Sequence, residues 1–155
     1  MFKVRNAVTF LFVLLLFSAC SSELHCERHY FVRGFTGRVT IYYNQEKGFK
    51  ETDERGCNVF RISEEGESFS GFLFKQGTAT PHDTFRYFET LSKDSLLEIK
   101  EFFKSEYLSD SSGQKEDRKY VFFISSGFHN PDGKSPTYTR DYVVDYGRNF
   151  RNYEP

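Results

Sequence analysis

Short segments in which apolar and polar residues alternate recur between residues 29 and 90, and they constrain the fold more than any other feature of the chain. Within residues 38–43, Val39, Ile41 and Tyr43 fall on one side of an extended backbone, and the residues between them fall on the other. A period of two is typical of a β-strand with one buried face. The other segments with this pattern are 58–62, 68–74 and 84–90. The first half of the domain is therefore predicted to be β-structure.

Three further features extend this prediction. Glycines at both ends of residues 34–37 suggest a hairpin between the strand around Phe31 and the strand at 38–43. Residues 120–124 are apolar at every position, as expected for a central strand that is covered on both faces. Residues 137–146 are predicted to be the last strand, after a turn over residues 130–133.

One helix is predicted between these two groups of strands. Apolar residues from Leu96 to Tyr107 recur at steps of three and four, which is helical spacing. Ser95 and Glu98 are spaced as in a capping box, where the two side chains bind free N–H groups of the first turn. The sequence thus predicts a helix over residues 94–106. The fold class is mainly β, a single β-sandwich-like domain or small barrel with one helix, after an N-terminal signal peptide.

Residues 1–19 have the organisation of a secretory signal peptide. Lys3 and Arg5 make the start positive, an apolar run covers residues 7–17, and small residues follow it. An apolar helix of that length spans about half of a ~30 Å hydrocarbon core, which is too short for a permanent membrane span.

Cys20 distinguishes this signal from an ordinary one. Residues 16–20 resemble a lipobox, in which small residues precede a cysteine that is acylated and becomes the new N-terminus. Phe17 departs from that motif, because leucine is usual three positions before the cysteine. We expect cleavage before Cys20 and a lipid anchor, such as palmitate, on its sulfur and new N-terminus; a plain signal cleaved near Ala19 is the alternative. Ser21 occupies the position after the cysteine, where an aspartate would favour retention in the inner membrane. The expected location is the cell membrane or outer membrane, with the domain outside the cytoplasm.

The predicted organisation is a signal peptide at 1–19, a lipidated tether at 20–28 and a β-rich domain at 29–155. Cleavage removes two of 21 basic residues and none of 22 acidic residues, which leaves a formal charge of −3. That charge argues against nucleic acid as a partner. The expected partners are the membrane, through Cys20, and an envelope protein or glycan.

Lipidation of Cys20 would leave Cys26 and Cys57 as a pair. Exported proteins meet an oxidising compartment in many bacteria, so we predict a disulfide between these two residues. Two free thiols are the alternative, because some bacteria lack oxidising machinery outside the cytoplasm.

No catalytic residue is predicted. The chain contains no G-x-S-x-G segment, and nothing in the sequence places a nucleophile beside His82 or His129. No cofactor site is predicted either.

No metal site is predicted. On a helix, His25 and His29 could share a metal with Cys26 and Glu27. This segment is short and polar, so we interpret it as a solvated tether.

The runs HYFVRGFTGRVTIYYNQEKG and GCNVFRISEEGESFSGFLFKQG resemble an uncharacterised domain of small bacterial lipoproteins. That domain combines an apolar strand, a Gly-aromatic-x-Gly turn, a G-x-V-x-I strand and a later R-I-P-E-x-G segment. The resemblance covers residues 29–77. Arg33 and Ser63 depart from it, since proline is common at both positions. It implies an envelope location and a β fold, and it supplies no activity.

These observations favour a membrane-anchored envelope lipoprotein that binds another component or serves structurally and is not an enzyme. One alternative is a small hydrolase that acts on cell-wall or glycan material. Another is a membrane-held inhibitor or immunity protein.

Overall fold

The computed structural model describes residues 26–74, 85–129 and 137–153. Its strands are β1 (Glu27–Phe31), β2 (Gly37–Tyr42), β3 (Glu51–Thr52), β4 (Asn58–Arg61), β5 (Glu67–Phe69), β6 (Phe85–Ser92), β7 (Ser95–Glu101), β8 (Lys119–His129) and β9 (Thr137–Tyr146). Its helices are α2 (Lys104–Ser109) and the 3-10 helix η1 (Gly147–Tyr153). The predicted mainly β fold is confirmed, and so is the last strand at 137–146. The turn predicted at 130–133 lies outside the described residues.

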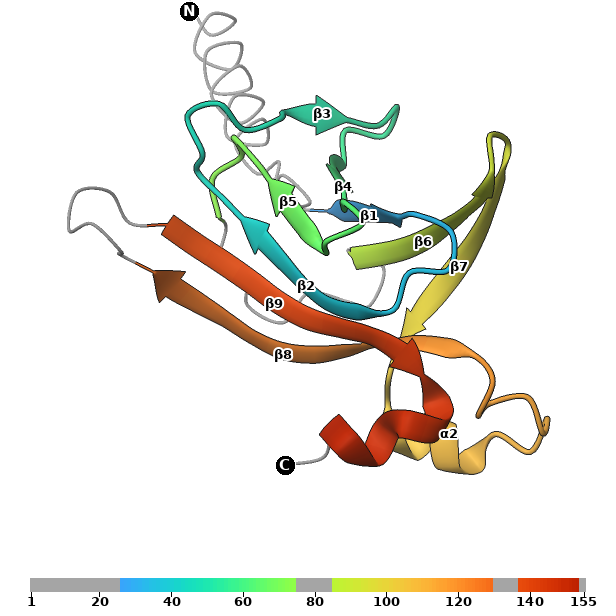
Figure 1. The fold of residues 1–155 in the computed structure, drawn as a ribbon. Coiled ribbons are helices and arrows are strands. Elements are labelled where there is room, and N and C mark those ends of the chain that lie inside the picture. The colour runs from blue at the N-terminus through green and yellow to red at the C-terminus, as the bar shows by residue number, and fades with distance from the viewer. Residues whose placement is uncertain (1–25, 75–84, 130–136, 154–155) are drawn as a thin grey trace, which may run out of the picture.

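The described strands form one sheet in the order β3-β4-β1-β6-β7-β8-β9-β2-β5, which curls into a half-barrel (Figure 1). β7 connects the two halves of the sheet. It pairs antiparallel with β6, and its last residues, Lys100 and Glu101, pair in parallel with Tyr120 and Val121 of β8. The expected sandwich or small barrel is therefore a single curled sheet.

The two edge strands of this sheet, β3 and β5, are brought together by the residues beside them. Phe49 bridges Ser70 in parallel. The Phe49 N–H donates to the carbonyl of Phe69 and the Gly71 N–H donates to the carbonyl of Phe49, both at 3.0 Å. These bonds satisfy backbone groups that an open sheet edge would leave exposed.

The predicted hairpin across residues 34–37 is wrong. β1 lies between β4 and β6 and pairs in parallel with both, whereas β2 pairs with β9 and β5. Both hydrogen-bonding edges of β1 are thus occupied, and residues 32–36 cross to the other half of the sheet. Phe35 in this crossing segment is 8% exposed and stacks on Phe31 at 5.6 Å, so burial of its ring holds the segment against the core.

The helix predicted at 94–106 is also wrong. Residues 95–101 form β7, which follows β6 through a tight turn, and only residues 104–109 are helical. Ser95 pairs with Ser92 in that hairpin and caps no helix; the residue before α2 is Phe103. The apolar residues in this segment have helical spacing, but pairing with β6 and β8 stabilises residues 95–101 as a strand. These tertiary contacts outweigh the local propensity.

Two apolar clusters cover opposite faces of the central strands. The larger lies inside the curl and includes Val121, Tyr142 and Val144. The smaller lies under α2 and η1 and includes Phe122 and Val143. Residues 120–122 of β8 and 142–144 of β9 are therefore covered on both faces, as the apolar run predicted for a central strand.

Candidate functional site

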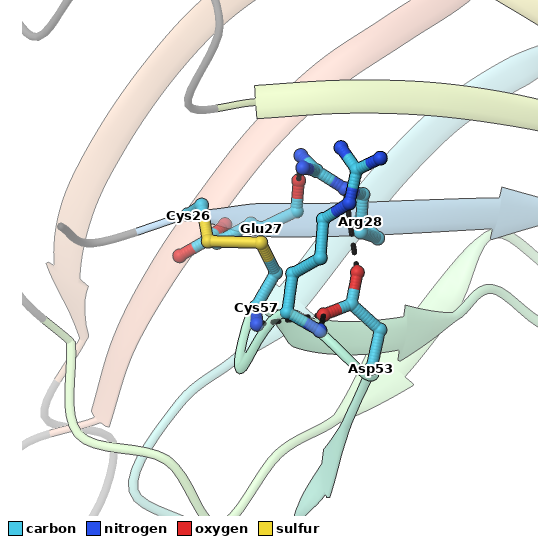
Figure 2. Close-up of a disulfide and its surroundings, with 6 residues drawn as sticks. Cys26, Glu27, Arg28, Asp53 and Cys57 are labelled. Carbon is cyan, nitrogen blue, oxygen red and sulfur yellow. Dashed lines mark hydrogen bonds and ion pairs between the residues drawn. A yellow bond between two sulfur atoms is a disulfide. The ribbon is translucent and has the colours of Figure 1, made fainter.

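The predicted disulfide between Cys26 and Cys57 is present, with the two Cα atoms 4.8 Å apart (Figure 2). It joins the residue before β1 to the residue before β4. Asp53 accepts a hydrogen bond of 2.9 Å from the Cys57 N–H, and its other oxygen lies 3.6 Å from Nε of Arg28. The disulfide and this ion pair together fasten the turn between β3 and β4 to the start of β1.

The start of β1 does not behave as the predicted solvated tether. The strand begins at Glu27, and Glu27, Arg28 and His29 are 1%, 7% and 0% exposed. The helix on which His29 could have shared a metal with Glu27 is therefore not formed, because residues 27–31 are a strand. Cys20 and His25 lie outside the described residues, so lipidation of Cys20 stays a prediction.

The Glu27 side chain is the centre of a buried network made by Glu27, His29, Tyr43, Arg140 and Tyr142. Arg140 Nη1 donates to Glu27 Oε2 at 2.6 Å. The Tyr43 hydroxyl donates to the same oxygen at 3.1 Å, and His29 Nε2 lies 3.1 Å from it. β1, β9 and the residue after β2 therefore meet at one carboxylate inside the curl.

His29 is held in one protonation state by its surroundings. Burial lowers its pKa below the ordinary value of 6.5, although hydrogen bonding and charge from Glu27 oppose this. In the neutral ring, Nε2–H donates to the Glu27 carboxylate, which can only accept. Nδ1 then accepts from the Tyr142 hydroxyl at 2.8 Å. Burial also raises the pKa of Tyr142 and Tyr43 well above 10, so both phenols remain donors.

The polar groups of the buried network are satisfied. Every buried side-chain nitrogen or oxygen in the described residues has a hydrogen-bond partner. The guanidinium of Arg140 also lies 4.5 Å from the centre of the Phe85 ring. The network places a fully buried histidine and a buried carboxylate between β1, β9 and the residue after β2.

A second buried ion pair holds the two halves of the sheet together. Lys119 Nζ of β8 lies 2.8 Å from Glu89 Oε2 of β6, and both side chains are under 10% exposed. The other oxygen of Glu89 accepts from the Gly34 N–H. The segment that replaces the expected hairpin is thus fixed to both halves by one carboxylate.

A cleft of about 300 Å³ opens beside the buried network, where β6 and β7 approach α2. Its lining residues are Phe85, Arg86, Tyr87, Glu98, Ile99, Lys100, Glu101, Phe103 and Glu106. Tyr87 and Ile99 are 5% and 3% exposed. The Tyr87 hydroxyl donates to Glu101 Oε1 at 3.0 Å. The cleft thus combines aromatic and aliphatic surface with a few fixed polar groups, as small-ligand sites do.

The outer face of the first half of the sheet carries aromatic rings that are already covered by charged side chains. Tyr30 and Phe88 stack at 5.3 Å on neighbouring strands. The Arg61 guanidinium lies 5.6 Å from the Tyr30 ring, and the Arg86 guanidinium lies 5.1 Å from the Phe88 ring. Cation–π contacts of this kind occupy the ring faces that a sugar would need.

Two of the histidines singled out from the sequence lie in the part of the chain that the structure describes. His29 is buried in β1, His129 ends β8, and His82 lies outside the described residues. In residues 26–74, 85–129 and 137–153, no three His, Cys, Asp or Glu side chains gather so that they could hold a metal ion.

Sequence reasoning missed Arg140 and Glu101, and it considered Glu27 only as a possible metal ligand within a solvated tether. The signal for Arg140 was its position in the middle of the last strand, because a charged residue in a central strand is rarely buried without a partner. Glu27 carried no comparable signal, since it sits in a polar segment.

No protein-family model and no curated protein matches this chain. Among solved structures, it resembles a crystal structure described as "Putative Lipoprotein from Bacillus anthracis". The TM-score is 0.52 at 16% identity, over 76% of this chain and 68% of that chain. At this level of identity, the comparison shows that the two proteins share a fold.

None of the helices in the described residues is long and apolar enough to cross a membrane.

Proposed function

We propose that this protein is a lipid-anchored envelope protein whose β domain is a non-enzymatic binding module. The lipobox-like residues before Cys20 support the anchor. The fold it shares with the structure described as a Bacillus anthracis lipoprotein is compatible with this proposal.

One observation carries the non-enzymatic part of the proposal. His29, which lies beside Glu27 and Arg140, is buried, and both of its ring nitrogens are engaged by internal hydrogen bonds. A general base must reach the proton it removes, and His29 cannot reach a bound molecule without the core opening.

We assign binding to the cleft beside α2. Its polar rim includes Lys100 and Glu106, which are exposed, and its floor is the buried pair Tyr87 and Ile99. A rigid apolar floor under a mixed polar rim suits an envelope protein segment or a glycan.

The anchor is tested with Cys20→Ser. Because the acyl chains on one residue would hold the protein, the variant should leave the membrane fraction or stall unprocessed, and it should lose its fatty-acid label. Wild-type fractionation with an unchanged label would contradict the anchor.

The binding assignment is tested with Glu106→Lys at the cleft rim. The lipidated chain, solubilised in detergent, serves as bait for envelope protein and peptidoglycan fractions. The matched control is Glu116→Lys, which makes the same charge change at an exposed position outside the cleft. Capture should fall with Glu106→Lys and persist with Glu116→Lys. Equal capture by both baits would contradict the assignment.

A further inference from the structure

The outer face of the second half of the sheet combines aromatic rings with a low strip of small side chains. Tyr42 of β2 stacks on Phe69 of β5, with ring centres 4.8 Å apart and ring planes 7° from parallel. On the other side of Tyr42, Thr139 of β9 pairs with Tyr42, and Gly127 of β8 pairs with Thr139. These four strands are neighbours in the order β8-β9-β2-β5 (Figure 1). The Tyr42 ring therefore borders a strip that carries no side chain at Gly127.

No contact among the described residues requires glycine at position 127. Gly127 is exposed, and its φ is not positive. A Cβ atom there would meet only the Thr139 hydroxyl oxygen, at 3.8 Å, which is ordinary van der Waals contact. The register shift in β8 lies between Phe123 and Ser125, so Gly127 is in regular pairing. Glycine inside a strand often marks a place where a ligand approaches the backbone closely. A molecule lying on the strip would account for this glycine.

Hydrogen-bonding groups lie on the same face, beside Gly127. The Asp141 carboxylate accepts from the Thr40 hydroxyl at 2.7 Å and from Arg38 Nη2 at 3.1 Å. Its other oxygen accepts from the Thr139 hydroxyl at 3.3 Å. Because both hydroxyls donate to Asp141, the lone pairs of their oxygens are left as acceptors. The Arg38 side chain is 68% exposed, so its other N–H groups face solvent as donors. This face therefore presents fixed acceptors next to a donor.

The Tyr42 ring has one face directed toward this strip. Phe69 stacks on the face turned toward β5, so the opposite face is turned toward Thr139. The part of the chain that the structure describes places no second aromatic ring against Tyr42. This arrangement differs from that of Tyr30 and Phe88, whose rings are covered by guanidinium groups. We refer to residues Thr40, Tyr42, Gly127, Thr139 and Asp141 as the outer strip.

The chemistry of the outer strip is suited to a sugar. A pyranose ring has C–H groups that pack on an aromatic face, and its hydroxyls both donate and accept hydrogen bonds. The charges on this face favour a neutral sugar. Arg38 is accompanied by the carboxylates of Asp141 and Glu67, since Glu67 pairs with Thr40 of β2, and one positive and two negative groups leave a net charge of −1. A polyanion would be repelled there.

We infer that a neutral oligosaccharide binds to the outer strip, with one sugar ring packed on Tyr42 above Gly127 and its hydroxyls bonded to Asp141 and Arg38. The outer strip shares no residue with the cleft beside α2, so this inference goes beyond the proposed function and does not depend on the cleft.

The test is titration calorimetry of the full mature chain with three neutral tetrasaccharides: chitotetraose, cellotetraose and maltotetraose. The chain is kept in a zwitterionic detergent, because a glycoside detergent would compete for the site. Gly127→Val fills the strip, and the open space around Gly127 lets the strand accept the side chain. The matched control is Ser126→Val, which adds the same kind of side chain at the neighbouring exposed residue, on the opposite face of β8. Arg38→Gln removes the exposed donor and provides a second variant.

We expect the wild type to bind at least one of the tetrasaccharides. Gly127→Val should weaken that binding by about tenfold or more, and Arg38→Gln should weaken it as well. Ser126→Val and the cleft variant Glu106→Lys should bind the sugar as the wild type does.

Three results would overturn the inference. The first is a wild type that binds none of the three sugars. The second is unchanged binding by Gly127→Val, or by Arg38→Gln if circular dichroism shows that Gly127→Val does not fold. The third is loss of binding with Glu106→Lys and not with Gly127→Val, which would place the sugar in the cleft beside α2 and leave the proposed function standing.

Discussion

Glu27 and Arg140 are 113 residues apart in the chain, and a hydrogen bond of 2.6 Å joins them in the interior of the curled sheet. Their side chains are 1% and 10% exposed. The bond connects the first strand of the described residues to the last, and β1 and β9 lie in different halves of the sheet. A buried ion pair of this kind stabilises less than its short distance suggests, because both charges lose their hydration. Its clearest consequence is that neither partner can be lost alone.

Arg140→Ala is therefore expected to be costly. It leaves the Glu27 carboxylate buried without its guanidinium, which should lower the free energy of unfolding by about 3–5 kcal/mol. The matched control is Arg61→Ala, which breaks the exposed Arg61–Glu51 pair and should cost no more than about 1 kcal/mol. Urea denaturation measures both. Similar losses in the two variants would show that the Glu27–Arg140 pair is not buried as described.

His29 predicts a dependence of stability on pH. Its folded pKa is lower than its unfolded value near 6.5, so below that pH the unfolded chain binds a proton that the folded chain excludes. Stability should fall between pH 6.5 and 5.5, by at most about 1.4 kcal/mol per pH unit. His29→Gln should flatten this part of the curve, whatever its effect at pH 7. The same slope in both proteins would assign the effect to another group.

The disulfide should contribute strongly to stability. Cys26 and Cys57 are 31 residues apart, and closing such a loop stabilises by about 3–4 kcal/mol in the chain-entropy model. Reductant should lower the denaturation midpoint of the wild type and leave the Cys26→Ser/Cys57→Ser variant unchanged. Intact mass after alkylation checks the bond directly. Labelling of both thiols in freshly isolated protein without reductant would rule the bond out.

Two substitutions in β7 distinguish the observed strand from the helix that the sequence predicted over residues 94–106. Ser95→Ala should change the free energy of unfolding by no more than about 0.5 kcal/mol, because Ser95 is exposed and caps no helix. Ile99→Ala should cost about 2–5 kcal/mol, because the Ile99 side chain is buried at 3% exposure in the core. Chemical denaturation of the purified variants gives both values. A loss near 1 kcal/mol from Ser95→Ala, with reduced helical circular dichroism, would favour the helix.

Local patterns in the sequence were sufficient for several features of this protein. Alternation identified the mainly β class, and the last strand was predicted over residues 137–146, where it lies. The apolar run at 120–124 indicated a strand covered on both faces. Counting cysteines paired Cys26 with Cys57. Each of these features depends on neighbouring residues or on chemistry that every fold must obey, so no knowledge of distant contacts was needed.

Tertiary structure alone decided the rest. Residues 95–101 match a helix by spacing, and they form a strand because β6 and β8 supply hydrogen-bonding edges on both sides. Glycines suggested that β1 and β2 form a hairpin, and burial of Phe35 instead carries the chain across to the other half of the sheet. Glu27 resembled part of a solvated tether until the fold placed Arg140 beside it. The Glu27–Arg140 contact joins residues 113 positions apart. All three outcomes depend on strand pairing and burial that no local pattern specifies, and the free energy of these tertiary contacts outweighs local preference.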